Sequence, residues 1–177
     1  SLPYIFRNNK KLPESYNFFS QNRKKNLYWK SKLISKKKIN VGIAWQGSIT
    51  HESDYKRSIQ LKKFKLLLQI KDIEFISLQK GYGKEQIISN RFEKLIIDFA
   101  GEIDSFQDTV AIIENLDLVI SVDTAVAHIA ATMNKNTWIL LPFVPDFRWG
   151  LKNTKTSWYK NVKLFRQSKI NQWAEVI

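Results

Sequence analysis

The chain has 177 residues, of which 44% are hydrophobic, so it can bury one substantial core, and we expect one domain with an appendage. The absence of cysteine excludes a disulfide framework, thiol catalysis and cysteine-based zinc sites. The sequence also contains no apolar run of about 18 residues, the length that a transmembrane helix needs. The net charge of +13 rests on 23 lysines and only 6 arginines; because bidentate base contacts use arginine, we expect weak attraction to polyanions and no specific nucleic-acid binding.

The amino-terminal region differs in character from the rest of the chain. Residues 1–20 are aromatic and polar without clear periodicity, and we interpret them as a strap that packs on another part of the protein. Residues 21–37 predict a lysine-rich surface helix with an incomplete apolar face. The chain starts at Ser1 and has no signal-peptide pattern. We therefore expect a missing upstream region and a cytoplasmic protein, with the inner face of the membrane as an alternative location.

From residue 39 onward, apolar segments of strand length alternate with amphipathic segments of helical length. Six strands are predicted, at residues 39–45, 74–79, 95–99, 118–122, 137–141 and 162–166. Helices are predicted at residues 61–70, 84–92, 106–116 and 123–131, and another begins at 173–177. Asp104 and Asp108 are interpreted as ordinary capping and surface residues. The alternation predicts an α/β fold with a parallel, doubly wound sheet and right-handed crossovers.

The most informative joint between a strand and a helix lies in the sequence DLVISVDTAVAHIAA, residues 117–131. Its strand is apolar on both faces and should therefore be central. Small residues then recur at helical spacing, and Asp123 or Thr124 can cap the helix. Because free amides and the helix dipole point outward at such a joint, we expect an anionic ligand here.

Polar loops follow the first two strands. Gln46-Gly47-Ser48 ends the first strand at the edge of the sheet that also holds the Asp123 joint. Residues 56–58 (Lys-Arg-Ser) precede a predicted helix, and they suit either a phosphate-facing loop or a solvated one. The Gly-x-Gly at residues 81–83 is too weak to indicate a dinucleotide fingerprint. Residues 143–159 form a long aromatic loop, of the kind that is usually functional or mobile.

Five segments resemble the carboxyl-terminal half of glycosyltransferase family nine, which contains the ADP-heptose:lipopolysaccharide heptosyltransferases. They are VGIAWQGS at residues 41–48, RSIQL at 57–61, FISLQKG at 75–81, DTVAIIENLDLVISVDTAVAHIAA at 108–131 and LLPFVPDFRW at 140–149. The most specific is DLVISVDT with His128 following. The resemblance extends from about Pro3 to the end, and it is closer to heptosyltransferase-like domains that follow tetratricopeptide repeats in bacterial proteins.

The resemblance implies a GT-B architecture, in which two Rossmann-like domains face each other across a cleft and the second holds most of the nucleotide-sugar donor. Residues 39–177 would form this donor-binding domain. Residues 1–38 would be a linker strap and helix from an amino-terminal domain of the same protein. In the resembled family that other domain carries the acceptor site and the expected catalytic base, so no catalytic residue is assigned here.

The resemblance also implies a set of donor-binding residues. They are Gln46, Gly47, Arg57, Ser58, Lys80, Glu85, Asp123, Thr124, Ala125 and His128. Asp123 would face sugar hydroxyls, with Thr124 and the amide of Ala125 near the diphosphate. Arg57 would neutralise the diphosphate, and Glu85 would lie near the base or ribose.

Two segments depart from the family pattern, and several residues have a structural alternative. Ala125 stands where heptosyltransferases often have glycine, and PFVPDFRW replaces a shorter loop. Asp123 could serve only as a helix cap, and His128 could be satisfied within its helix. Trp149 and Trp158 could close the edge of the core rather than stack on a sugar.

The implied function is that of a glycosyltransferase donor-binding domain, in inverting, metal-independent transfer from a nucleotide-diphosphate sugar to a glycan or protein acceptor. Arg57 and helix-end amides would stabilise the leaving diphosphate. With only His51 and His128 and no cysteine, we expect no protein-bound metal and no cofactor. The alternative is a non-catalytic nucleotide-binding or scaffold domain of GT-B origin.

Overall fold

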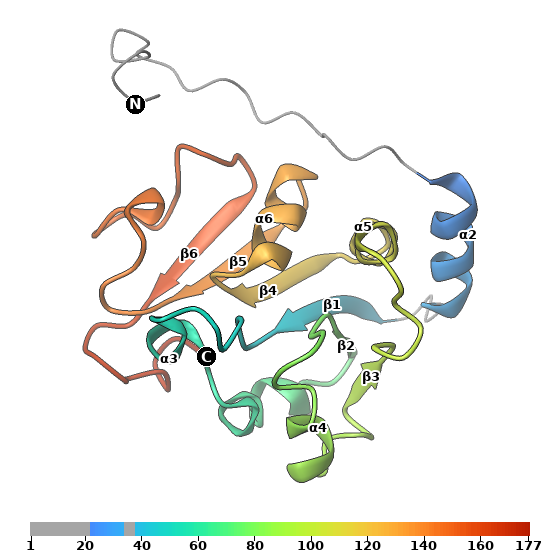
Figure 1. The fold of residues 1–177 in the computed structure, drawn as a ribbon, viewed down its shortest axis with the longest axis horizontal. Coiled ribbons are helices and arrows are strands. Elements are labelled where there is room, and N and C mark those ends of the chain that lie inside the picture. Colours follow the sequence, from blue (N-terminus) through green and yellow to red (C-terminus); the bar gives the residue numbers. More distant parts are fainter. Residues whose placement is uncertain (1–21, 34–37) are drawn as a thin grey trace, which may run out of the picture.

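The computed structural model describes residues 22–33 and 38–177 (Figure 1). The predicted strap over residues 1–20 lies outside these residues, and so do parts of the predicted helix that follows it. Within the described residues this helix is α2, Arg23–Lys32. No helix in the described part of the chain has both the length and the apolar character needed to cross a bilayer.

Six parallel strands form one sheet, which confirms the predicted fold class (Figure 1). The strands are β1 Ile39–Ala44, β2 Ile73–Ser77, β3 Ile96–Asp98, β4 Leu118–Val122, β5 Thr137–Leu141 and β6 Val162–Arg166. Their order across the sheet is β3-β2-β1-β4-β5-β6. This is the strand order of a Rossmann-type sheet. The last four residues of both β1 and β4 are buried, as expected for central strands with continuous apolar sequences.

The sheet has a topological switch point between β1 and β4. These strands are neighbours, with Ala44 beside Ser121, but β1 continues towards β2 and β4 towards β5. The loops after β1 and β4 therefore diverge to opposite faces of the sheet. In open α/β sheets, ligands bind in the crevice that this divergence leaves at the carboxyl ends of the strands.

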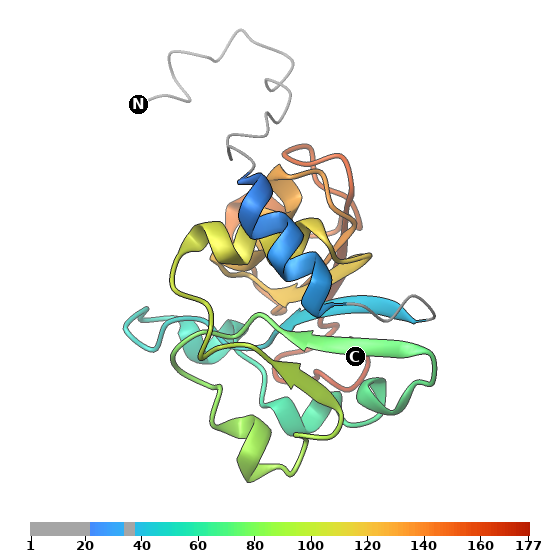
Figure 2. The same ribbon diagram turned by 90° about the vertical axis from the view of Figure 1, so that its right-hand side faces the viewer.

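Helices cover both faces of the sheet. On one face lie α5, Phe106–Glu114, and α6, Ala125–Thr132, with α2 packed against α5 (Figure 2). On the other face a second core includes residues from the short elements η1, Leu61–Phe64, η2, Leu67–Gln69, and α4, Gln86–Ser89. Alternate strand residues supply the two cores, as the period of two in a strand requires.

Three predicted helices differ from the structure. Residues 61–70 form two short 3₁₀ turns, because the buried pair Leu61 and Phe64 has the spacing of three that a 3₁₀ turn also satisfies. Residues 84–92 are helical only over α4. Residues 173–177 form turns and no helix. The loop before η1 contains a further short helix, α3, Asp54–Arg57, which periodicity could not reveal in four residues.

Asp108 completes a capping box at the start of α5, which confirms the capping part of its interpretation, but it is buried and fixes α2 on α5, so the surface part was wrong. Its carboxylate accepts hydrogen bonds from Lys25 Nζ at 2.5 Å and Trp29 Nε1 at 3.2 Å, both on α2. It also accepts from the N–H and O–H of Ser105 at the start of α5. Burial alone would raise the pKa of Asp108, but hydrogen bonds from Lys25, Ser105 and Trp29 bring it well below its ordinary value.

Asp108→Ala is expected to lower the free energy of unfolding by about 2 kcal/mol, since it removes a cap and a charged hydrogen-bond partner. Lys25 is one-third exposed and can be rehydrated, which limits the loss. A carboxylate with a lowered folded-state pKa stabilises the protein above its unfolded pKa, about 3.9, and loses this effect as the pH falls further. Urea unfolding should therefore separate the variant from the wild type at pH 7, and the separation should shrink progressively as the pH falls from about 4 through the lower folded pKa. The exposed neighbour Asp104, changed to alanine, is the control, and an equal loss there would contradict the anchoring role.

Candidate functional site

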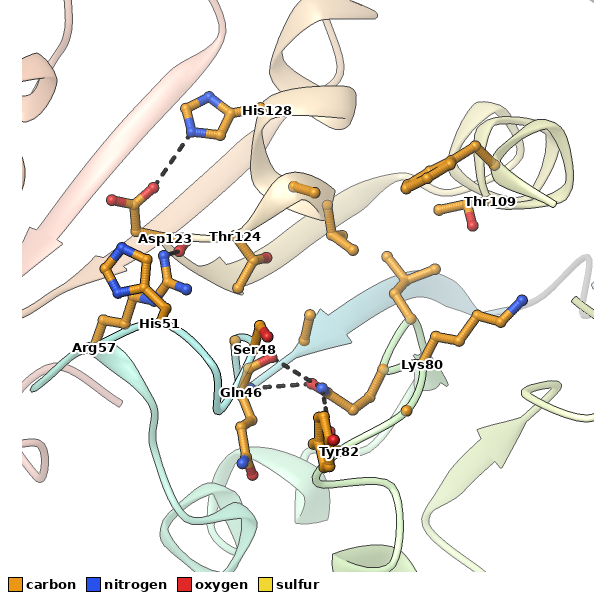
Figure 3. Close-up of a pocket in the computed structure, with 18 of the residues that line it drawn as sticks. Gln46, Ser48, His51, Arg57, Lys80, Tyr82, Thr109, Asp123, Thr124 and His128 are labelled. Atoms are coloured by element: carbon orange, nitrogen blue, oxygen red, sulfur yellow. Dashed lines mark hydrogen bonds and ion pairs between the residues drawn. The ribbon is translucent and has the colours of Figure 1, made fainter. Parts of the chain in front are cut away.

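A cavity of about 730 Å³ lies at the switch point of the sheet, beyond the carboxyl ends of the central strands (Figure 3). Its wall is formed by the loops after β1, β2 and β4, the starts of α5 and α6, and η3, Phe147–Trp149. The lining residues are Ala44, Gln46, Gly47, Ser48, His51, Arg57, Leu78, Gln79, Lys80, Gly81, Tyr82, Phe106, Thr109, Asp123, Thr124, Ala125, Val126, His128 and Arg148. The volume is in the range of small-molecule sites.

The β4–α6 joint forms one wall of the cavity. The amino-terminal cap position of α6 is Thr124, and no described side chain caps the helix. The Thr124 hydroxyl instead shares a hydrogen bond of 3.1 Å with Ser121 Oγ. The capping role considered for Asp123 and Thr124 is therefore not observed. The start of α6 presents its amides and positive dipole end beside the exposed Ala125, which lines the cavity.

Asp123 faces His128, one turn along α6 (Figure 3). The Oδ1 atom of Asp123 lies 3.4 Å from His128 Nε2, and the carboxylate side chain is only 10% exposed. Burial alone would raise the pKa of Asp123, but the interaction with His128, the nearby Trp149 N–H and the charge of Arg148 lower it below its ordinary value. Asp123 is thus an ionised acceptor in a largely dry position.

The loop between β5 and β6 closes this wall from outside. Trp149, in η3, is buried, and its ring stacks on His128 with centroids 5.3 Å apart and planes 23° apart. Its buried indole nitrogen has no hydrogen-bond partner of good geometry among the described residues, but the N–H is near enough to Asp123 to help lower the pKa of that carboxyl. Trp149 closes the edge of the core as one interpretation expected, whereas Trp158 is 43% exposed.

Arg57 joins the loops after β1 and β4. Its Nε atom lies 3.1 Å from Asp54 Oδ1, and its NH1 group donates to the backbone carbonyl of Asp123 at 2.9 Å. Asp54 is buried and also accepts from the Ser58 hydroxyl at 2.8 Å. Arg57 therefore reaches the cavity, as the phosphate-facing interpretation required, but its charge is already paired with a buried carboxylate.

Gly47 and Ser58 belong to the same cluster. Ser58 Oγ accepts a hydrogen bond from the Gly47 N–H at 2.9 Å, and it lies behind the cavity wall rather than on it. A Cβ atom at Gly47 would overlap the Asp54 carboxylate and come within 2.7 Å of the Arg57 guanidinium. Glycine is therefore required here for close packing.

Gln79 is a buried amide that connects the loops after β1 and β2. Its oxygen accepts from the N–H groups of Trp45 and Gln46, at 3.1 and 3.0 Å. Its nitrogen donates to the carbonyls of Gln46 and Tyr82, at 2.9 and 2.7 Å. The side-chain oxygen of Gln46 itself accepts from Gln86 Nε2 at 2.9 Å, so Gln46 contributes to the cavity wall with this oxygen already engaged.

The structure brings eight of the ten predicted donor-binding residues to one cavity. The exceptions are Ser58, which supports the wall, and Glu85, which is exposed and does not line the cavity. Lys80 lines it, but its ammonium group donates to the carbonyl of Ile103 at 2.6 Å, away from Asp123 (Figure 3). The roles assigned to these residues towards a donor remain predictions.

Sequence reasoning did not single out several residues that shape the site. In the sequence Asp54 and Gln79 look like ordinary polar loop residues, and only the tertiary structure shows that both are buried. Arg148 and Tyr159 lie in the long aromatic loop of residues 143–159, and the length of that loop was the available signal. No group of three or more potential metal-ligating side chains occurs within the described residues.

Comparison with known proteins agrees with this architecture. The model of glycosyltransferase family 9 (heptosyltransferase) matches residues 75–140. The E. coli ADP-heptose LPS heptosyltransferase II structure matches 84% of this chain and 45% of its own, with a TM-score of 0.58 and 17% identity. A glycosyl transferase family 9 structure from Veillonella parvula DSM 2008 matches 84% and 41%, with a TM-score of 0.56 and 9% identity. No curated protein sequence matches the chain.

The chain thus spans less than half the length of these two structures. At such low identity the likeness establishes the fold. This chain has the Rossmann-like fold found in heptosyltransferase structures, and the family model matches the segment that contains the β4–α6 joint.

Proposed function

We propose that this domain binds a nucleotide-diphosphate sugar and serves as the donor-binding half of a GT-B glycosyltransferase. The observation that carries the proposal is the combination found at the switch point. One cavity is lined by an uncapped helix start at Ala125, by the arginines Arg57 and Arg148, and by the ionised Asp123. A diphosphate suits the cationic groups and amides, and a sugar suits an acceptor-only carboxylate.

On this proposal the sugar is transferred to an acceptor hydroxyl with inversion, and the cationic groups of the cavity assist the departure of the diphosphate. The acceptor oxygen would attack the anomeric carbon while the bond to the diphosphate oxygen breaks, and the diphosphate would leave with the electron pair. Arg57, Arg148 and the amides of α6 would stabilise its negative charge without a metal ion. The Asp123 carboxylate would accept hydrogen bonds from the hydroxyls of the sugar, and this would orient the anomeric carbon.

The remaining components belong to the proposal as well. The acceptor would be a glycan or a protein, and its site and the base that takes its proton would come from an amino-terminal domain of the same protein. We place the protein in the bacterial cytoplasm or at the inner face of the membrane, in association with tetratricopeptide repeats. If catalysis has been lost, the same cavity would serve a nucleotide-binding or scaffold domain, which turnover by the longer protein would distinguish.

A nucleotide-diphosphate sugar is expected to raise the melting temperature of this chain, whereas a nucleoside monophosphate should do so less. A ligand that binds only the folded state adds about 2.7 kcal/mol of stability at 100 times its Kd. A thermal-shift screen over several bases and sugars measures this directly. Stabilisation by heparin or oligonucleotides alone, with steep salt dependence, would instead support simple polyanion binding.

A further inference from the structure

His128 is held from three sides by groups that come from different parts of the chain. Its Nε2 atom faces Asp123 Oδ1 at 3.4 Å, and its Nδ1 atom lies 2.9 Å from the hydroxyl of Tyr159. Trp149 stacks on one face of the ring. Tyr159 precedes β6 and lies 31 residues further along the chain, so the β5–β6 loop directly contacts the helix that lines the cavity.

The two contacts of the imidazole ring are not equivalent. An ionised Asp123 can only accept a hydrogen bond, which favours a hydrogen on the Nε2 atom that faces it at 3.4 Å. In the neutral ring the Nδ1 atom is then an acceptor, and the Tyr159 hydroxyl is the group that donates to it. The Nδ1–H tautomer would turn an Nε2 lone pair towards the carboxylate, which is unfavourable.

The loop that supplies Tyr159 is itself tied to the sheet. Arg166, at the end of β6, donates to the backbone carbonyl of Trp149 at 3.1 Å. Leu164, within β6, donates its N–H to the carbonyl of Thr154 at 2.8 Å. Tyr159 also packs against the buried core that includes Trp149. The hydroxyl that meets His128 is therefore presented by a supported segment.

We propose that Tyr159 is a positioning residue, which keeps His128 in the Nε2–H tautomer and thereby holds the Asp123 carboxylate in one orientation at the cavity. The residue acts through His128 and does not touch the ligand. The tautomer claim stands on the observed contacts alone. The consequence for nucleotide-sugar affinity rests on the proposed function.

The tautomer is measured by long-range ¹H–¹⁵N correlation spectra of the imidazole rings. The chain has only two histidines, so the His51→Gln variant assigns the His128 signals. In the wild type at a pH where the ring is neutral, Nε2 should appear as the protonated nitrogen and Nδ1 as the unprotonated one. Tyr159→Phe should move both nitrogens part of the way towards averaged shifts, because Nδ1 has lost its donor and only Asp123 still favours the Nε2–H tautomer. Tyr55→Phe removes the same hydroxyl from an exposed tyrosine outside the cavity, and it should change neither.

The same variants test the consequence for binding. Tyr159→Phe should weaken nucleotide-sugar binding by about three- to tenfold, the range of one neutral hydrogen bond, and leave the bare nucleotide diphosphate unaffected. An Nδ1–H tautomer in the wild type, or an unchanged tautomer in Tyr159→Phe, would overturn the positioning role. If the tautomer shifts as expected but the wild type binds no nucleotide sugar, positioning stands and the proposed function fails.

Discussion

Replacement of Arg57 by methionine is expected to lower the free energy of unfolding by about 3 to 5 kcal/mol, the usual cost of removing one partner from a buried ion pair. The carboxylate of Asp54 would be left in a position that is 6% exposed, with the Ser58 hydroxyl as its remaining partner. The link from Arg57 to the Asp123 carbonyl would also be lost. Since the Arg57 side chain is 20% exposed, some water can enter, and the lower end of the range is expected in chemical denaturation.

A double variant separates the structural role of Arg57 from its role towards a ligand. Asp54→Asn with Arg57→Met removes the uncompensated charge, so most of the lost stability should return. This folded variant still lacks the Arg57 cation, and it should bind a nucleotide diphosphate about tenfold or more weakly, the scale of one charged hydrogen bond. Full affinity in the double variant would mean that Arg57 only supports the cavity wall.

Asp123→Asn is expected to weaken nucleotide-sugar binding by about 10- to 100-fold, because hydrogen bonds to charged groups contribute about 1.5 to 3 kcal/mol each. The amide has a similar shape and can still accept from His128, so stability should change little. The bare nucleotide diphosphate, measured by calorimetry on both proteins, is the control and should bind equally well. Equal losses for both ligands would indicate a distorted cavity rather than a lost sugar contact.

The pH dependence of nucleotide-sugar binding is a second test of the role of Asp123. The pKa of Asp123 is lowered in the folded protein, so its carboxylate stays charged throughout the neutral and mildly acidic range. Its contribution to stability is present above the unfolded pKa of about 3.9 and is lost as the pH falls through the lower folded value. The preference of the wild type for a sugar nucleotide over the bare nucleotide should therefore persist down to about pH 4.

Sequence patterns predicted the sheet because burial on both faces leaves a continuous apolar signal. The strands β1 and β4 are examples. The remaining strands were predicted because apolar segments of strand length alternate with amphipathic segments of helical length. The short elements were harder to predict. The pair Leu61 and Phe64 fits an α-helix and a 3₁₀ turn equally well, and the side chains that would decide between them lie on the sheet rather than in the local sequence.

The site was predictable only where sequence neighbours are also neighbours in space. Thr124 and His128 are four residues apart, so the sequence placed both on one helical face next to the joint at Asp123. The partners of Arg57 and His128 could not be, because Asp54 looks like an ordinary loop residue and Tyr159 arrives from a separate loop. Long-range pairing of this kind depends on how the loops fold over the sheet edge.

The amide of Gln79 joins two loops through four hydrogen bonds to backbone groups. The two loops therefore lose their conformational entropy when the protein folds and not when a ligand binds, so this part of the cavity is preorganised. Glutamate could not replace Gln79, because a carboxylate has no N–H groups for the two carbonyls. The β1 and β2 loops thus form a floor of the cavity whose shape is set before a ligand binds.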